Sequence, residues 1–299
     1  MKATTLLPLA ALLLLSSCDR PGKAIEISGS FEATEVVVSA EASGRILAFD
    51  AREGARVEAG EELGRIDSAQ LVLRRRQLLA SKTAVESRRS DADLQLASIR
   101  QQIDSARRER ERVKNLIAAD AASRKQLDDL DAQIASLEKE AAARQTNIER
   151  ANAGVSGESS SLDLQAAQLD DLIAKCAIAS PIDGTILVAY AERGEYATQG
   201  RALFKVADLE NMDLRAYATA GELSQVRIGQ EVAVLADFGA KEERKYAGRV
   251  AWISDEAEFT PKTAQTQDER ASLVYAVKVA VRNDGYLKIG MYGKVRLGE

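Results

Sequence analysis

The residue types that most often carry enzyme chemistry are scarce in this sequence. It contains no histidine, which removes the commonest general base and the commonest metal ligand. It also lacks a nucleophile elbow, a phosphate-binding glycine loop and a pair of cysteines at metal-ligand spacing. Many of its carboxylates fall in long helical stretches, where a solvated helix face explains them. We therefore predict a protein that is not an enzyme and that uses neither a cofactor nor a metal.

Covalent chemistry is expected at Cys18 instead. Residues 1–17 hold one lysine, a long apolar run and then small residues, which is typical of a secretory signal peptide and too short for a lasting transmembrane helix. Residues 15–18, Leu-Ser-Ser-Cys, are similar to a lipobox, where bacterial lipoproteins are cleaved and the new N-terminal cysteine is acylated. A plain secretory signal with an incidental cysteine is the alternative. Acylation would anchor the mature chain to a membrane, and Asp19 resembles the signal that retains lipoproteins at the inner membrane.

The cysteine content and the net charge bear on disulfide bonds and on binding to nucleic acid. Once Cys18 is acylated, Cys176 is the single remaining thiol, so no intrachain disulfide is expected. Cys176 lies on an apolar row of residues and is predicted to be a small buried side chain. The net charge of −5, with arginines scattered along the chain, gives no reason to expect binding to nucleic acid.

Residues 68–177 are predicted to form the element that organises the chain, an antiparallel coiled-coil hairpin. Apolar residues recur there every seven positions in two series, which is typical of a coiled coil. At 1.5 Å per residue, arms of about 50 residues span about 75 Å. The first series is Leu71, Leu78, Val85, Ala92, Ile99, Ala106 and Val113, and the second is Leu127, Ile134, Ala141, Ile148, Val155, Leu162, Leu169 and Cys176.

The hairpin has one weak stretch and needs one turn. Gly154 and Gly157 are poor helix formers. Because the heptad phase continues through them, we expect a weak or bent but continuous second helix, with two stacked segments as the alternative. The middle of the hairpin falls near residue 122, which places the tip at residues 116–123. Asp120 and Ser123 are suitable helix-capping residues there.

A repeated glycine pattern flanks the hairpin. Two series of five residues share steps of 10, 6, 3 and 3, and they are Gly44, Gly54, Gly60, Leu63, Ile66 and Gly184, Gly194, Gly200, Leu203, Val206. Each glycine is expected at a turn that needs a positive φ. The two halves, residues 39–67 and 178–208, resemble those of a biotinyl/lipoyl domain, with residues 18–38 as a lipid-anchored tether and entry strand. No carrier lysine stands where Asp67 leads into the first helix, which argues against an acyl or biotin carrier subunit, another class considered.

Residues 209–299 are predicted to form a C-terminal β-barrel. Short apolar stretches separated by glycine turns fit the strands of a small closed barrel, with a turn or short helix at residues 221–229. The predicted strands are residues 212–218, 231–236, 246–253, 273–281 and 293–297. The fold class is therefore α+β, multidomain and elongated. It consists of a split biotinyl/lipoyl-like β domain, a long antiparallel coiled-coil hairpin inserted into it, and the C-terminal β-barrel.

Arg112, Leu116 and Ser123 stand around the predicted turn with the spacing R-x3-L-x6-S. This resembles the tip motif by which periplasmic adaptors of the HlyD, or membrane fusion protein, family dock onto a TolC-like outer-membrane channel. The alternative is that Arg112 is an ordinary surface residue, Leu116 belongs to the seam between the arms, and Ser123 is only a helix cap.

The C-terminal residues carry the same resemblance. The segments that resemble the barrel of HlyD-type adaptors are residues 222–223, 226–232, 259–262 and 287–291. One departure is Ile289, which stands where proline is usual in the family. Residues 256–263 and 273–275 are similar to the branch that serves ABC-type exporters. The sequence ends just after the barrel, so the further membrane-proximal domain of some family members is expected to be missing or minimal.

The resemblance implies a periplasmic adaptor for efflux or secretion, anchored to the inner membrane as a lipoprotein through Cys18. Its partners would be an inner-membrane transporter of ABC type, a TolC-like outer-membrane channel bound by Arg112, Leu116 and Ser123, and further copies of itself in a ring. The alternative function is an envelope-spanning structural or lipid-transfer conduit without a TolC-like partner, which would differ at the tip alone.

Overall fold

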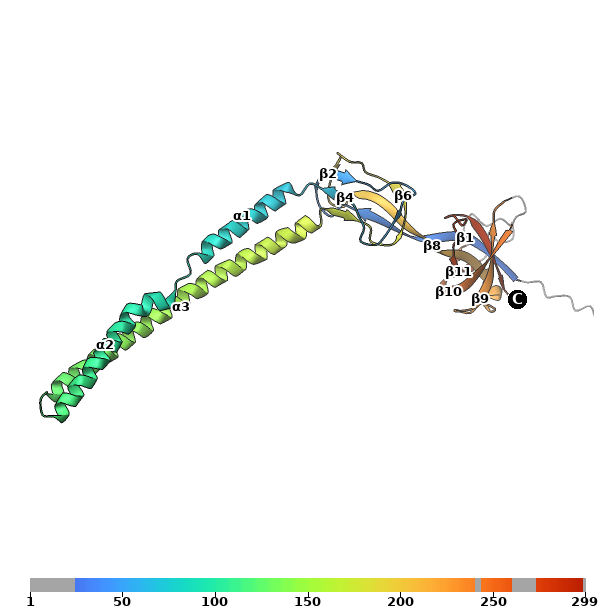
Figure 1. Cartoon of the computed structure of the whole chain (residues 1–299). Helices are drawn as coiled ribbons and strands as arrows, with labels where there is room; N and C mark the ends of the chain where they lie inside the picture. Colours follow the sequence, from blue (N-terminus) through green and yellow to red (C-terminus); the bar gives the residue numbers. More distant parts are fainter. Residues whose placement is uncertain (1–24, 240–242, 260–272, 298–299) are drawn as a thin grey trace, which may run out of the picture.

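The computed structural model describes residues 25–239, 243–259 and 273–297. The predicted signal peptide, Cys18, the first part of the predicted tether and residues 260–263 of the ABC-type motif lie outside these residues. Figure 1 shows an elongated molecule in which a helical hairpin, a sandwich of strands and a barrel of strands follow one another. The predicted α+β class and elongated shape are confirmed. No helix within the described ranges is long and apolar enough to cross a membrane.

The hairpin consists of three helices, α1 (Ala69–Glu86), α2 (Ala92–Ala118) and α3 (Arg124–Ala174). As predicted, α3 runs unbroken through the weak stretch at Gly154. The prediction of one continuous first arm was wrong, because residues 87–91 leave the helix between α1 and α2. The Asp91 carboxylate accepts hydrogen bonds from the N–H groups of Asp93 at 2.9 Å and Leu94 at 3.2 Å, and so caps a new helix. The spacing of seven residues continues across this cap, so the start of a new helix cannot be recognised from the heptads.

Polar side chains of α3 form hydrogen bonds with the residues around the break in the first arm. The Asn152 side chain donates to the Ser90 carbonyl and accepts from the Ser90 N–H, both at 2.9 Å. The Ser159 hydroxyl donates to the Glu86 carboxylate at 2.8 Å. These hydrogen bonds add to the apolar seam at this stretch, so polar groups also hold the chain between α1 and α2 against α3.

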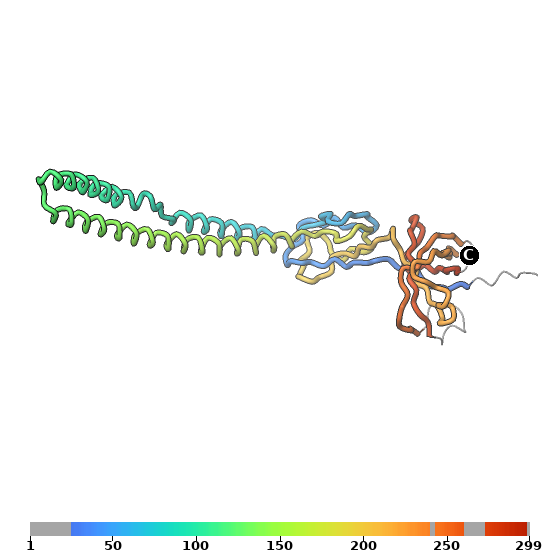
Figure 2. The backbone as a smooth tube through the Cα atoms, turned by 90° about the horizontal axis from the view of Figure 1, so that it is seen from below, coloured from blue at the N-terminus to red at the C-terminus, as the bar shows by residue number. Residues whose placement is uncertain are grey.

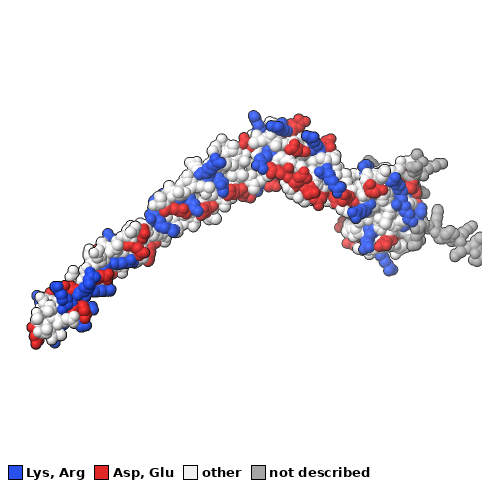
Figure 3. Space-filling model, viewed as in Figure 1, with Lys and Arg blue, Asp and Glu red and all other residues white. Residues whose placement is uncertain are grey.

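Elsewhere the seam is apolar and follows the predicted heptads. Both predicted series are buried or half-buried throughout. Near the end of α3, Leu172 is 43% exposed, whereas the next residue, Ile173, is half-buried. Inter-arm ion pairs such as Arg107–Glu138, at 2.7 Å, join the two arms. Charges of both signs follow the rod (Figure 3); exposed pairs of this kind add little stability but disfavour a shifted register.

Replacing Gly154 and Gly157 together by alanine is expected to stabilise the hairpin by about 1–2 kcal/mol. A methyl group at either position meets no atom within 4 Å, so the gain comes from the lower entropy of the unfolded chain. Thermal unfolding followed by helical circular dichroism measures it. The matched control, Ala151→Gly on the same exposed face of α3, should unfold at a lower temperature. A double alanine variant that unfolds no later than the wild type contradicts the expectation.

The sandwich packs two sheets that are related by an internal repeat. One sheet has the order β5-β4-β2-β7 and the other the order β1-β8-β6-β3. The strands are β1 (Ile25–Ser39), β2 (Gly44–Phe49), β3 (Arg56–Val57), β4 (Glu62–Ile66), β5 (Ala177–Ala179), β6 (Gly184–Ala189), β7 (Tyr196–Ala197) and β8 (Ala202–Thr219). The Gly54 N–H donates to the Ile186 carbonyl at 2.8 Å, and in the other half the Gly194 N–H donates to the Ile46 carbonyl at 2.9 Å. The two predicted halves therefore build one core.

The repeated glycines serve two purposes, of which one was predicted. Four of them take the expected positive φ, and these are Gly54, Gly60, Gly194 and Gly200. Gly44 and Gly184 do not, so the prediction was wrong there. A Cβ on Gly44 would lie 2.8 Å from Cγ2 of Ile66, and one on Gly184 would lie 2.4 Å from the Ala207 carbonyl oxygen. Glycine is needed at these two positions because the backbone passes close to a neighbouring strand.

The C-terminal strands close into a barrel together with β1 and β8. Besides these two, the barrel contains β9 (Glu231–Asp237), β10 (Glu243–Phe259), β11 (Leu273–Arg282) and β12 (Tyr292–Leu297). Their order is β1-β12-β9-β10-β11-β8, and β8 pairs back with β1. The short helix α4 (Ala220–Leu223) overlaps the predicted turn or short helix. The five predicted strands are confirmed, but the barrel closes only with β1, which begins in the segment that was predicted to be a tether and entry strand. Phe31, Leu214 and Val279 are fully buried inside.

Two strands continue from the barrel into the sandwich. β1 begins at Ile25 against β12, and its second half pairs with β8 in the sandwich. β8 runs through Asp208, the last residue of the predicted lipoyl-like half. At this level Ala33 pairs with Met212 and the next residue, Thr34, pairs with Asp208, so β8 bulges between the two domains. The junction is therefore a pair of continuous strands.

Candidate docking surface at the hairpin tip

A tight turn joins α2 to α3 at the predicted position. Asp120 takes a positive φ of 56°, and the Ala121 N–H donates to the Leu116 carbonyl at 2.9 Å. This is the Schellman arrangement at a helix end, with aspartate where glycine is commonest. Ser123 precedes α3, and its N–H donates to the side-chain oxygen of Gln126 at 3.3 Å. Asp120 and Ser123 therefore both stand at helix ends.

The substitution Asp120→Gly is expected to stabilise the tip by about 0.5–1 kcal/mol, because a left-handed backbone conformation is unfavourable for an L-residue but not for glycine. Hydrogen-exchange protection of the amides in residues 113–126 measures the effect locally. The control is Asp120→Ala, which should lower protection because alanine tolerates this conformation less well than aspartate. Equal protection in all three proteins contradicts the expectation.

The three candidate residues lie on the outside of this tip. The Arg112 side chain is 72% exposed and forms an ion pair with Glu109 at 2.8 Å. Leu116 is 41% exposed, whereas Val113 on the same helix is buried against the other arm. Ser123 is also exposed. The alternative in which Leu116 belongs to the seam is therefore wrong.

Arg112, Leu116 and Ser123, which we call the tip surface, combine three kinds of contact. Arg112 and Leu116 are four residues apart on α2 and so share one face of the helix. Ser123 adds a hydroxyl from the start of α3. This set contains no nucleophile beside a base, but a guanidinium and a hydroxyl around an exposed aliphatic side chain suit binding to another protein. Glu109 was not among the predicted site residues, although its spacing of three residues from Arg112 is the usual signal for a helical ion pair.

The other candidate positions give no reactive site. Cys18 lies outside the described residues. Cys176 is free and buried, and burial raises the pKa of its thiol, so it is an unreactive packing residue. Where a carrier lysine would stand, the Asp67 carboxylate accepts a hydrogen bond from the Ala69 N–H at 2.9 Å as α1 begins. Within the described part of the chain, no cluster of cysteine and carboxylate side chains could hold a metal ion.

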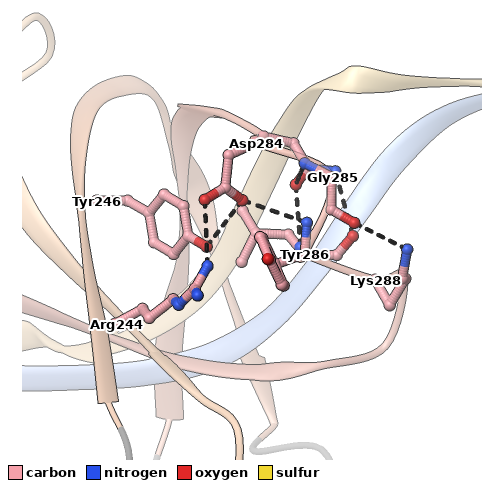
Figure 4. Close-up of polar contacts among 8 residues, drawn as sticks. Arg244, Tyr246, Asp284, Gly285, Tyr286 and Lys288 are labelled. Atoms are coloured by element: carbon pink, nitrogen blue, oxygen red, sulfur yellow. Dashed lines mark hydrogen bonds and ion pairs between the residues drawn. The ribbon is translucent and has the colours of Figure 1, made fainter.

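A polar cluster on the barrel has a structural explanation (Figure 4). The Arg244 guanidinium lies 3.8 Å from the centre of the Tyr286 ring, and the Tyr246 hydroxyl donates to the Asp284 carboxylate at 3.0 Å. Burial alone would raise the pKa of Asp284, but hydrogen bonds from the Tyr286 N–H and the Tyr246 hydroxyl outweigh it and hold that pKa below its usual value. These contacts fasten the β11–β12 connection to β10.

Asp284→Asn is expected to destabilise the barrel at neutral pH, and the difference from wild type should shrink in acid. A carboxyl group with a lowered pKa in the folded state adds stability above its ordinary pKa, and this is lost as the pH falls below about 4. Denaturant unfolding followed by Trp252 fluorescence at pH 7 and at about pH 3 measures this, since the chain has one tryptophan and it lies in β10. Asp255→Asn, at an exposed position of the same strand, is the control. An Asp284 difference that is equal at both pH values contradicts the assignment.

The sequence matches one family model over most of its length. The model is described as the barrel-sandwich hybrid domain of RND MFP, and it matches residues 34–209 of the 299 in the chain. This range contains the hairpin and nearly all of the sandwich, including the tip surface.

Solved structures of low sequence identity share the fold. MacA from Actinobacillus actinomycetemcomitans is 21% identical, with a TM-score of 0.54, over 92% of this chain and 78% of MacA. A MacA–MexA chimeric protein with the Pseudomonas aeruginosa MexA α-hairpin domain is 22% identical, with a TM-score of 0.52, over 92% of this chain and 80% of the chimera. The membrane fusion protein Spr0693 from Streptococcus pneumoniae R6 is 17% identical, with a TM-score of 0.50, over 92% of this chain and 99% of Spr0693.

Proposed function

Because this chain belongs to the membrane fusion protein family through its barrel-sandwich hybrid domain, we propose that it is a periplasmic adaptor that bridges an inner-membrane ABC-type exporter to a TolC-like outer-membrane channel for efflux or secretion. The observation that carries the proposal is the exposed tip surface at one end of a long rod. The two β domains lie at the other end (Figure 2).

The dimensions of the chain fit a bridge. α3 has 51 residues, which corresponds to about 77 Å at 1.5 Å per residue. A thin, charged rod of this length buries little apolar surface for its size, and its use is to reach across a gap. Cys18 precedes Ile25 by seven residues, a distance of at most about 25 Å. An acylated Cys18 would therefore hold the barrel near the inner membrane and direct the tip away from it.

The ABC class of the transporter is proposed from a motif in the C-terminal barrel. It is supported by the similarity of residues 256–263 and 273–275 to the branch serving ABC-type exporters. The described part of this motif lies together, since Ala257 pairs with Tyr275 between β10 and β11. The matching family model carries the name RND, so an RND-type transporter is the competing partner. Several copies of the adaptor are required in either case, since one hairpin cannot enclose a conduit.

Affinity purification of the tagged full-length protein from cross-linked cell envelopes tests these partners. We expect mass spectrometry to identify an ABC-type transporter and an outer-membrane channel, both absent from a purification with untagged protein. An RND-type transporter in place of the ABC-type transporter overturns the transporter assignment. Consistent absence of an outer-membrane channel overturns the bridge and favours the conduit without a TolC-like partner.

A further inference from the structure

Both arms of the hairpin are weak at the same level. In the first arm, residues 87–91 leave the helix between α1 and α2, and the break lies beside α3 (Figure 1). In the second arm, α3 contains Gly154 and Gly157, and glycine is the least favourable residue in a helix apart from proline. The Arg89 guanidinium in the break donates to the Ser156 hydroxyl at 2.8 Å. Since Ser156 lies between the two glycines, they stand directly opposite the break.

The hairpin buries little apolar surface at this level. Within α3, which the structure describes in full, Ile148 and Ala166 are buried, and Ser159 is the one buried residue between them. The other seam residues of α3 in this stretch are half-buried. In the first arm, the buried side chains nearest to the break on each side are Val85 and Leu96. A stretch with few buried apolar contacts opens at a lower free energy than its surroundings.

The contacts that join the arms here are polar. Asn152 exchanges two hydrogen bonds with Ser90, both at 2.9 Å, and Arg88 pairs with Glu158 at 3.3 Å through side chains that are more than half exposed. Such groups can bind water in place of each other at a small cost in free energy. Helices bend sharply at pairs of glycine and serine, and residues 154–161 contain two glycines and four serines. The second arm can therefore bend where the first arm is already interrupted.

We propose that residues 87–91 and 152–161 form a hinge, at which the outer part of the hairpin moves as one body against the rest of the chain. The outer part consists of α2 and residues 124–151, and its own seam contains buried apolar side chains that keep it rigid. The hinge lies roughly 40 Å from the tip at 1.5 Å per residue, so a bend of about 20° displaces the tip surface by about 15 Å. This inference does not depend on the partners in the proposed function.

Distances between pairs of spin labels, measured by double electron–electron resonance on the lipid-free chain with Cys18→Ala, test the hinge. Labels on Thr146→Cys and Leu164→Cys span it, whereas labels on Asp128→Cys and Thr146→Cys lie within the outer part. The members of each pair are exposed and 18 residues apart in α3, so a rigid rod gives the same distance of about 27 Å for both. Cys176 is buried and is retained. We expect the spanning pair to give a distribution at least about 1.5-fold wider because the helix bends between its labels, and equal widths overturn the proposal.

Two changes at the hinge should move the width of the spanning pair in opposite directions. Gly154→Ala with Gly157→Ala should narrow it to that of the other pair, because alanine favours the helix. Asn152→Ala should widen it, because the two hydrogen bonds with Ser90 are lost, and Asn147→Ala, at an exposed position of the same helix, is the control. Circular dichroism confirms that the variants fold. A width that the alanines leave unchanged overturns the role of the glycines, and one that Asn152→Ala leaves unchanged overturns that of the polar contacts. Loss of the proposed partners would alter none of these widths.

Discussion

Replacing Arg112 and Leu116 together by aspartate is expected to weaken binding to the purified outer-membrane channel by about 100-fold or more, with no change in thermal unfolding. Both side chains are exposed and outside the seam, so they contribute little to folding. Central residues of a protein interface cost about 2 kcal/mol or more when removed, and 1.4 kcal/mol corresponds to a factor of ten in affinity. Biolayer interferometry with the lipid-free adaptor and the channel in detergent measures the dissociation constant.

The matched control for this experiment is Leu94→Asp with Arg100→Asp. These residues have the same types, lie on the same helix α2 and are exposed, but they lie far from the tip. The control should bind as the wild type does. Equal losses in the two double variants would mean that added negative charge on the hairpin explains the effect, and the tip surface would lose its assigned role.

Cys18→Ala is expected to move the mature protein from the membrane fraction to the soluble periplasmic fraction almost completely. Each buried methylene group of an acyl chain contributes about 0.8 kcal/mol, so several chains make a lasting anchor. The wild type, but not the variant, should incorporate labelled palmitate, and its mass should exceed that of the chain from residue 18 onward by the acyl groups. Ser17→Ala, which leaves a small residue before the cysteine, is the control and should stay on the membrane.

A Cys18→Ala protein that still sediments with salt-washed membranes, without label in the wild type, contradicts the lipoprotein assignment. The secretory signal with an incidental cysteine then explains residues 1–17, and attachment must come from the transporter. This result would leave the fold and the tip surface unchanged, because neither depends on Cys18.

The hairpin was predictable because burial along a seam depends mainly on residue type and spacing. Both heptad series are buried or half-buried where expected. The break at residues 87–91 was not predicted because Val85 and Ala92 keep the phase across it. It depends on the cap at Asp91 and on the hydrogen bonds that Asn152 makes from the other arm. The spacing of apolar residues in the first arm contains no information about that second contact.

The β domains show the same division between local and long-range causes. Positive φ at Gly54 and Gly194 follows from turn chemistry that a repeat reveals. The need for glycine at Gly44 comes from Ile66 on a strand that approaches it only in the folded domain. Likewise, the position of the tip follows from two arms of equal length, whereas the closure of the barrel by β1 and β8 is visible only once the strands are paired.

The most direct test of the bridge is a purification of the tagged adaptor from cross-linked envelopes, as wild type and as the Arg112→Asp, Leu116→Asp variant, with the ratio of channel to transporter measured in each. If the tip surface binds the channel, the wild-type adaptor co-purifies with both partners, and the variant retains the transporter but loses the channel. Equal amounts of channel with both proteins, or no channel with either, would contradict the claim that the tip surface joins the adaptor to the outer membrane.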